Sequence, residues 1–142
     1  MKLAEALQER SSLKKTISGL REKLEKAAEG KEKQTENPMK LLSELDRSLY
    51  RMEHLVAVIG HTNELVKVNG KTMTEMIAAR DTLFFRLELY KKLIRQAGAE
   101  TNQLPSGMNV PELQKKADNM LLEIRSLDQL IQKTNWTREL VE

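Results

Sequence analysis

Residues 42–66 read LSELDRSLYRMEHLVAVIGHTNELV, and the spacing of their apolar side chains decides the fold class. Apolar residues recur at alternating steps of three and four, which is typical of a helix that packs lengthwise against another helix. Asn63 is the polar exception in this row, which comprises Leu42, Leu45, Leu49, Met52, Val56, Ile59, Asn63 and Val66. We therefore predict a helix over residues 38–66, with Asn37 as its cap and Pro38 as its first residue.

The same spacing recurs three more times and predicts helices over residues 2–29, 73–98 and 110–134. Thr72 followed by Glu75, and Asn109 followed by Glu112, are helix-start signals for the last two. The three rows are Ala6, Arg10, Leu13, Ile17, Leu20, Leu24 and Ala27; Met76, Arg80, Leu83, Leu87, Tyr90, Ile94 and Ala97; and Leu113, Ala117, Met120, Ile124, Leu127, Ile131 and Thr134.

Short polar segments separate these helices. Residues 30–36 predict a loop, and Pro105-Ser106-Gly107 predicts a turn. Within residues 66–73, Asn69-Gly70 favours the positive φ angles of a type I′ turn, so this segment forms either a small β-hairpin tip or a plain loop.

Length and composition limit the architecture. The chain has 142 residues, of which 39% are hydrophobic and 4% aromatic, so one domain over residues 1–142 with an aliphatic core is expected. Long helices joined by short loops pack as antiparallel neighbours. The fold class is therefore all-α, with four long antiparallel helices arranged either as an up-down bundle or as two coiled-coil hairpins.

Charge and residue usage argue against several classes of function. Lys and Arg number 24 against 21 Asp and Glu, and the signs are interspersed, so we expect no nucleic-acid partner. The chain has no cysteine, and its apolar run at Leu55–Ile59 is too short to span a bilayer. The N-terminal segment has no signal-peptide core, which favours a cytoplasmic protein.

Catalytic and metal-binding signatures are also missing from the sequence. His54 and His61 lie on the helix face opposite the apolar row, without the further ligands that a metal site needs. No glycine-rich phosphate loop and no nucleophile elbow is found. We therefore predict a protein that is not an enzyme and that binds no metal and no cofactor.

Three polar residues interrupt the apolar rows: Arg10, Asn63 and Arg80. In an antiparallel bundle they fall at the same end, together with Asp81 and Asn135. One interpretation is an ion-pair layer that sets helix register, with Asp81, Glu5, Glu9 and Glu139 as the acids within reach. The other is a small-anion site, for which Arg10, Asn63, Arg80, Asp81 and Asn135 are the ligand-binding candidates.

A second apolar stripe lies on the outer side of the third helix. Phe85, Leu89 and Leu93 follow at intervals of four, and Leu122 holds the corresponding outer position on the fourth helix. Either the third helix is central and touches several neighbours, or these residues form a subunit interface. The second alternative predicts a homo-oligomer.

Several motifs together resemble the septicolysin-like family of small bacterial proteins. They are Met1–Arg10, His61-Thr62-Asn63, Asn69–Thr74, Ala79-Arg80-Asp81, Leu113–Asp118 and Asn135–Leu140. The resemblance implies an all-helical fold and an association with a cytolysin, and it supplies no catalytic residues.

Three functions follow as hypotheses. The first is a non-enzymatic helical protein that self-assembles. The second, which the resemblance implies, is a membrane-active cytolysin of the pore-forming type, the one case in which a membrane would be a partner. The third is a small-anion binding protein that uses the arginines at one end of the bundle.

Overall fold

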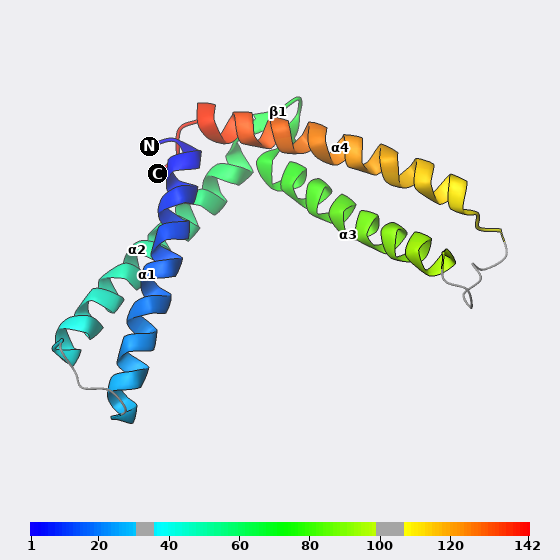
Figure 1. The fold of residues 1–142 in the computed structure, drawn as a ribbon. Coiled ribbons are helices and arrows are strands. Elements are labelled where there is room, and N and C mark those ends of the chain that lie inside the picture. The colour runs from blue at the N-terminus through cyan, green and yellow to red at the C-terminus, as the bar shows by residue number, and fades with distance from the viewer. Residues whose placement is uncertain (31–35, 99–106) are drawn as a thin grey trace. The chain divides into compact units, whose positions relative to one another are not determined.

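A computed structural model describes residues 1–30, 36–98 and 107–142. The elements are α1 (Leu3–Glu29), α2 (Pro38–Leu65), β1 (Lys67–Val68), β2 (Lys71–Thr72), α3 (Met73–Ala97) and α4 (Val110–Thr137) (Figure 1). The prediction of an all-α fold with four long helices is confirmed. Residues 31–35 of the loop predicted over residues 30–36 and the Pro105-Ser106 part of the predicted turn lie outside the described residues.

Side-chain caps begin three of the helices. Each cap oxygen accepts a hydrogen bond from a backbone amide two or three residues further on, as the helix-start signals predict. The pairs are Asn37 with Met39 at 3.0 Å, Thr72 with Glu75 at 3.1 Å, and Asn109 with Glu112 at 2.8 Å. Helix α4 continues to Thr137, beyond the predicted end at 134, and within it the Thr134 hydroxyl donates to the Leu130 carbonyl at 2.7 Å.

The hairpin between α2 and α3 is formed, as the first of the two alternatives for residues 66–73 predicts. Lys67 pairs with Thr72 and Val68 with Lys71 in antiparallel register. The turn residues Asn69 and Gly70 have φ angles of 53° and 81°. Both angles lie in the left-handed region that a type I′ turn requires, and this is why Asn-Gly is suited to the position.

The chain divides into two compact units. Unit 1 comprises Met1–Leu65 and Asn135–Glu142, and unit 2 comprises Val66–Thr134. The chain thus leaves unit 1 after α2, forms the whole of unit 2, and returns to unit 1 at the end of α4. A single folding domain over residues 1–142 stays a prediction.

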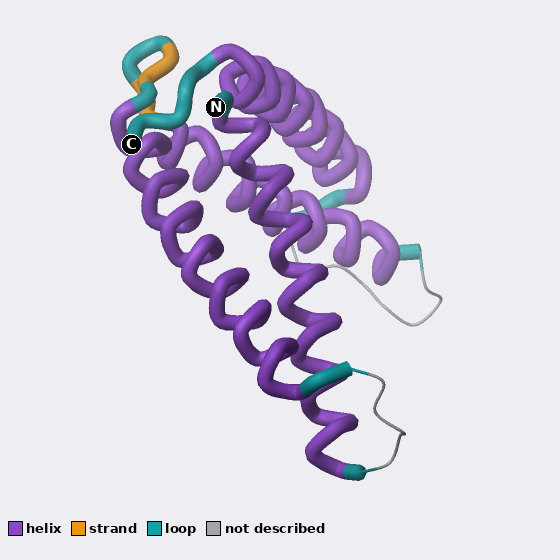
Figure 2. Tube along the Cα trace, turned by 90° about the vertical axis from the view of Figure 1, so that its left-hand side faces the viewer, coloured by secondary structure: helices purple, strands orange, loops and turns teal. Residues whose placement is uncertain are grey.

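In unit 1, α1 and α2 lie side by side as an antiparallel hairpin (Figures 1 and 2). Its core includes the fully buried side chains of Leu3, Ala6 and Leu55, and Leu140 from the C-terminal tail packs against them. The tail is paired with the N-terminus through hydrogen bonds from the Leu3 amide to the Arg138 carbonyl at 3.0 Å and from the Leu140 amide to the Met1 carbonyl at 2.8 Å.

The residues that α2 buries differ in part from the predicted row. Leu41, Leu55 and Thr62 are buried, whereas Leu42, Leu49 and Val56, which were predicted to face the core, are 40%, 45% and 48% exposed. The buried row and the predicted row have Leu45, Met52 and Ile59 in common. At their other positions the buried row lies one residue earlier in the chain, so both rows have heptad spacing. A polar Thr62 is accommodated because its hydroxyl donates to the Val58 carbonyl at 2.8 Å and accepts the Val141 amide at 2.9 Å.

Unit 2 packs α3 against α4 through the rows that the sequence predicts for these helices. One buried cluster joins Val66, Met73, Met76 and Ile131 near the β-hairpin. A second cluster joins Leu87 of α3 with Ala117, Met120 and Ile124 of α4. Two aliphatic clusters along one helix pair are what matching heptad rows produce.

Candidate functional site

The outer face of α3 is apolar and open to solvent. Phe85 is 75% exposed and Leu89 49%, and Leu93 is half-buried. Phe85 lies two residues, or about 200°, from the buried Leu87, and it therefore points away from the core of unit 2. An exposed phenylalanine with a leucine one turn further on is a feature of surfaces that bind a partner.

Leu122 is also exposed, at 62%. It lies two residues from the buried Met120, so it points away from α3, just as Phe85 points away from α4. The four residues predicted for a subunit interface are therefore divided between the two outer faces of the helix pair. Their role in assembly stays a prediction.

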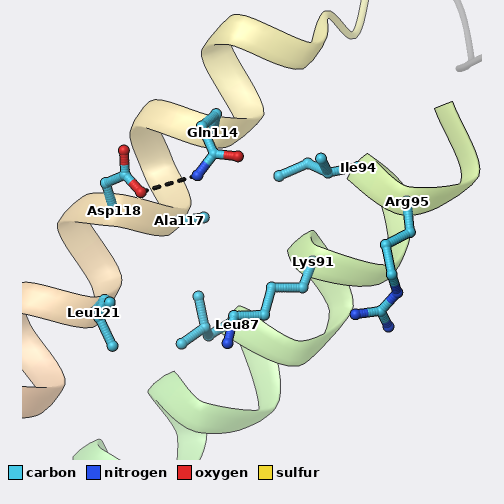
Figure 3. Close-up of a pocket in the computed structure, with 8 residues that line it drawn as sticks. All are labelled: Leu87, Lys91, Ile94, Arg95, Gln114, Ala117, Asp118 and Leu121. Atoms are coloured by element: carbon cyan, nitrogen blue, oxygen red, sulfur yellow. Dashed lines mark hydrogen bonds between the residues drawn. The ribbon is translucent and has the colours of Figure 1, made fainter. Parts of the chain in front are cut away.

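A groove of about 290 Å³ lies between α3 and α4 (Figure 3). Leu87 and Ile94 of α3 point toward Ala117 of α4, whose small side chain leaves space where other positions of the row hold larger residues. Lys91 and Arg95 line the α3 side. The α4 side carries Asp118, which accepts a hydrogen bond from the Gln114 side chain at 2.9 Å. Opposite charges on the two walls and an apolar floor suit the binding of another chain or a small amphipathic molecule.

Arg80 is held by two carboxylates. Its Nε donates to Asp81 at 3.3 Å and its Nη1 donates to Asp128 of α4 at 3.0 Å. The Arg80 side chain is 22% exposed, and those of Asp81 and Asp128 are 63% and 48% exposed. The pairing with Asp81 matches one of the alternatives that the sequence raises. Asp128 was missed, although its place four residues after the buried Ile124 puts it at the edge of the α4 row.

The other ligand-binding candidates belong to unit 1. Arg10 is half-buried on α1 and, among the residues that the structure describes, has no ion-pair partner. Asn63 is half-buried, and its buried Oδ1 has no hydrogen-bond partner in the described ranges. Asn135 is 7% exposed. The structure thus brings Arg80 and Asp81 together, and the convergence of all five candidates at one site stays a prediction.

Glu9, one of the acids predicted within reach of the interrupting arginines, pairs instead with Arg51 of α2. The guanidinium donates from Nε at 2.7 Å and from Nη2 at 2.9 Å, one bond to each carboxylate oxygen. These hydrogen bonds from Arg51 hold the pKa of Glu9 below its usual range. This bidentate pair, which the heptad spacing did not reveal, links α1 to α2.

Glu139, the second of the acids predicted within reach of the interrupting arginines, instead links the two ends of the chain. Its carboxylate contacts the Lys2 ammonium at 2.5 Å and the N-terminal amine at 3.1 Å. Two hydrogen bonds lower the pKa of Glu139, of which the one from Lys2 has the larger effect and the one from the N-terminal amine the smaller. Glu5, the remaining acid, accepts a hydrogen bond from the Lys2 backbone amide at 2.7 Å and so helps to begin α1.

Two further findings concern metals and membranes. His54 and His61 are exposed, and the described part of the chain contains no group of three or more metal-ligating side chains. Over the same residues, no helix combines the length and the apolar character that crossing a bilayer requires.

Comparison with known proteins corrects the family resemblance. The model of a family of unknown function, DUF6847, matches residues 10–140. A protein of solved structure from Corynebacterium diphtheriae, described as a functionally unknown conserved protein, is 32% identical, with a TM-score of 0.87 over 99% of each chain. No curated protein matches.

The resemblance to the septicolysin-like family is therefore wrong, and the cytolysin hypothesis loses the resemblance on which it mainly rested. The quoted motifs are short, and several of them are helix starts, chain-end contacts and heptad positions that unrelated helical proteins need for the same structural reasons. A family model that matches nearly the whole chain is much more specific evidence. The chain belongs to the family of unknown function DUF6847.

Proposed function

We propose that the protein is a non-enzymatic helical protein that acts by self-assembly. The observation that carries this proposal is the exposure of Phe85 on α3, 75% of whose surface is open to solvent. Leu89, one turn further on, extends the same apolar surface. An exposed apolar stripe led by a phenylalanine is typical of a surface that a partner covers.

The energy available from these two side chains is of the same size as the cost of association. Fully burying a large apolar side chain contributes roughly 1.5 to 3 kcal/mol, and scaling this by the exposed fractions gives about 2 to 4 kcal/mol per subunit for Phe85 and Leu89 together. Contacts that symmetry repeats add to this sum, against an association cost of about 4 kcal/mol or more. A dissociation constant of 1 μM needs about 8 kcal/mol net, so assembly at micromolar concentrations requires further contacts beside Phe85 and Leu89.

The side chains around the α3–α4 groove support a binding role over a catalytic one. Lys91, Arg95, Asp118 and Gln114 can hold polar groups, but they do not form the oriented nucleophile and base that covalent catalysis needs. Arg80 is already neutralised by two carboxylates, which favours a register-setting ion pair over an anion site. The lack of cysteine agrees with our expectation of a cytoplasmic protein.

Light scattering coupled to size exclusion tests the proposal. We expect a mass above the 16.3 kDa of one chain at about 50 μM. Phe85→Glu should lower this mass, because a charged side chain cannot be buried in an apolar interface without a large desolvation cost. Leu65→Glu is the matched control, since Leu65 is 55% exposed and belongs to α2 of unit 1, not to α3. A wild-type protein that stays monomeric at this concentration contradicts the proposal.

A further inference from the structure

The groove between α3 and α4 carries opposite charges on its two walls (Figure 3). Lys91 and Arg95, one helical turn apart on α3, form the basic wall. Asp118 of α4 is the one acid among the described side chains that line the groove, and Gln114 lies one turn before it. Cations on one wall and an anion on the other match a dipolar molecule better than they match a simple anion or a simple cation.

The alignment of the two helices places these charges at about the same height. The helices α3 and α4 run in opposite directions (Figure 1), and Arg80 of α3 donates to Asp128 of α4 at 3.0 Å. Lys91 lies eleven residues after Arg80, and Ala117 lies eleven residues before Asp128. Because the rise per residue is the same in both helices, Lys91 lies level with Ala117 and its neighbour Asp118.

The facing charges do not pair with each other. The Lys91 ammonium contacts Glu88 of its own helix at 3.9 Å, and Asp118 accepts its hydrogen bond from Gln114 of its own helix at 2.9 Å. In the part of the chain that the structure describes, no ion pair joins Lys91 or Arg95 to Asp118. An ammonium has three donors and a carboxylate accepts at two oxygens, so both walls keep capacity for a ligand.

The floor between the walls is aliphatic. Leu87 and Ala117 are buried, and Ile94 and Leu121 are half-buried beside them. A branched aliphatic side chain placed on this floor loses contact with water, which favours binding. The volume of about 290 Å³ corresponds to a molecule of roughly ten non-hydrogen atoms, if each takes about the 30 Å³ that one water occupies in the liquid.

We propose that this groove binds a zwitterionic amino acid with a branched aliphatic side chain, for which L-leucine is the probe. The ligand carboxylate contacts Lys91 and Arg95, the ligand ammonium donates to Asp118, and the aliphatic side chain lies on Leu87 and Ala117. This inference goes beyond the proposed self-assembly and does not depend on it, because a single chain contains the whole groove.

NMR titration of the isotope-labelled protein with L-leucine tests the site. We expect saturable shifts of the backbone amides in residues 87–95 and 114–121, with a dissociation constant of about 1 mM, since the groove is half open and the ligand is small. Three analogues each remove one feature: 4-methylpentanoate lacks the ammonium, 3-methylbutylamine lacks the carboxylate, and glycine lacks the side chain. Each should bind about three- to fivefold more weakly, because exposed charge pairs and partly buried side chains contribute modestly.

Substitutions in the walls identify the group that holds each charge. Asp118→Asn should weaken leucine binding about three- to fivefold, and should leave 4-methylpentanoate, which has no ammonium, bound at least as tightly as before. Lys91→Met combined with Arg95→Met should weaken leucine binding to a similar extent and leave the binding of 3-methylbutylamine undiminished. Lys92→Met is the matched control, since Lys92 is exposed on the same helix and does not line the groove. Circular dichroism shows that each variant is folded.

Three results would overturn this inference. One is the absence of saturable shifts in the groove at leucine concentrations up to about 20 mM, well above the expected dissociation constant. Another is leucine binding that is no tighter than that of the two singly charged analogues, or that Asp118→Asn leaves unchanged. The last is a measurable favourable coupling between Lys91 and Asp118 in a double-mutant cycle on the ligand-free protein, because the two side chains would then pair with each other in place of a ligand.

Discussion

Replacement of Arg80 measures how strongly the ion pair between α3 and α4 stabilises unit 2. Arg80 occupies a row that is otherwise apolar, and its guanidinium donates to Asp128 at 3.0 Å and to Asp81 at 3.3 Å. Arg80→Ala removes both hydrogen bonds and the aliphatic part of the side chain. Arg80→Met removes the charge and keeps most of the apolar volume, so the difference between the two variants separates charge from packing.

The exposure of the three side chains sets the expected magnitude. Removing one partner of a fully buried pair costs about 3 to 5 kcal/mol, because the other charge is left in an apolar environment. Asp81 and Asp128 are 63% and 48% exposed, so water can solvate them when Arg80 is lost. We therefore expect Arg80→Ala to lower the free energy of unfolding by about 1 to 2 kcal/mol, and Arg80→Met by about half of that.

Urea unfolding followed by circular dichroism gives these free energies, and a double-mutant cycle isolates the pair. The cycle comprises wild type, Arg80→Met, Asp128→Asn and the double variant. We expect a favourable coupling energy of about 0.5 to 1 kcal/mol between Arg80 and Asp128. Arg125→Met is the matched control, since Arg125 is exposed on α4 without an ion-pair partner among the described residues, and it should change stability by less than about 0.5 kcal/mol.

Two results would refute the reasoning. A coupling energy near zero would mean that the pair does not stabilise the packing of α3 on α4. An Arg80→Met variant that is more stable than the wild type and no longer stabilised by added phosphate would indicate an anion site in place of a register-setting ion pair.

Three further outcomes are expected. Arg51 lowers the pKa of Glu9, so the stabilisation from this pair is present above the unfolded-state pKa of about 4.3 and is lost as pH falls through the lower folded-state pKa. Urea unfolding between pH 7 and 3 should therefore show that acid destabilises Glu9→Gln less than it destabilises the wild type. The same pH dependence in both proteins would contradict this. Gly70→Ala should destabilise the protein by about 1 kcal/mol, because Gly70 has a φ of 81°. Gly60→Ala in the interior of α2 should stabilise it by about 0.5 to 1 kcal/mol, because alanine favours a helix more than glycine does. Equal shifts in melting temperature for the two variants would refute this distinction. Leu140→Ala should lower the free energy of unfolding by about 1 to 2 kcal/mol through lost packing on the core of unit 1, and a neutral effect in urea unfolding would mean that the tail is not needed there.

Local signals predicted the elements of the fold because the interactions that make them are local. Asn37, Thr72 and Asn109 cap helices through bonds to amides two or three residues away. Asn69-Gly70 forms its turn because both residues tolerate positive φ angles. The rows of α1, α3 and α4 face their partners as their spacing predicts.

The candidate site was predicted only where one helix determines it. The exposure of Phe85 and Leu89 follows from their place opposite Leu87 on the same helix. The partner of Arg80 on α4 depends on how α3 and α4 align, and heptad spacing is compatible with several alignments. Asp128 could be identified only once that alignment was known.

The amino-acid sequence by itself determined an all-α chain of four helices, three of them with side-chain caps, and it left a hairpin tip or a plain loop open between the second and the third. The tertiary structure decided which apolar row of α2 is buried. The rows containing Leu41 and Leu42 have the same heptad spacing, so periodicity cannot choose between them. The choice depends on contacts distant in sequence, among them the Val141 amide bound to Thr62 and the Arg51 guanidinium bound to Glu9. These contacts turn the first row toward α1 and leave Leu42, Leu49 and Val56 exposed, because one helix can cover only one of two adjacent rows.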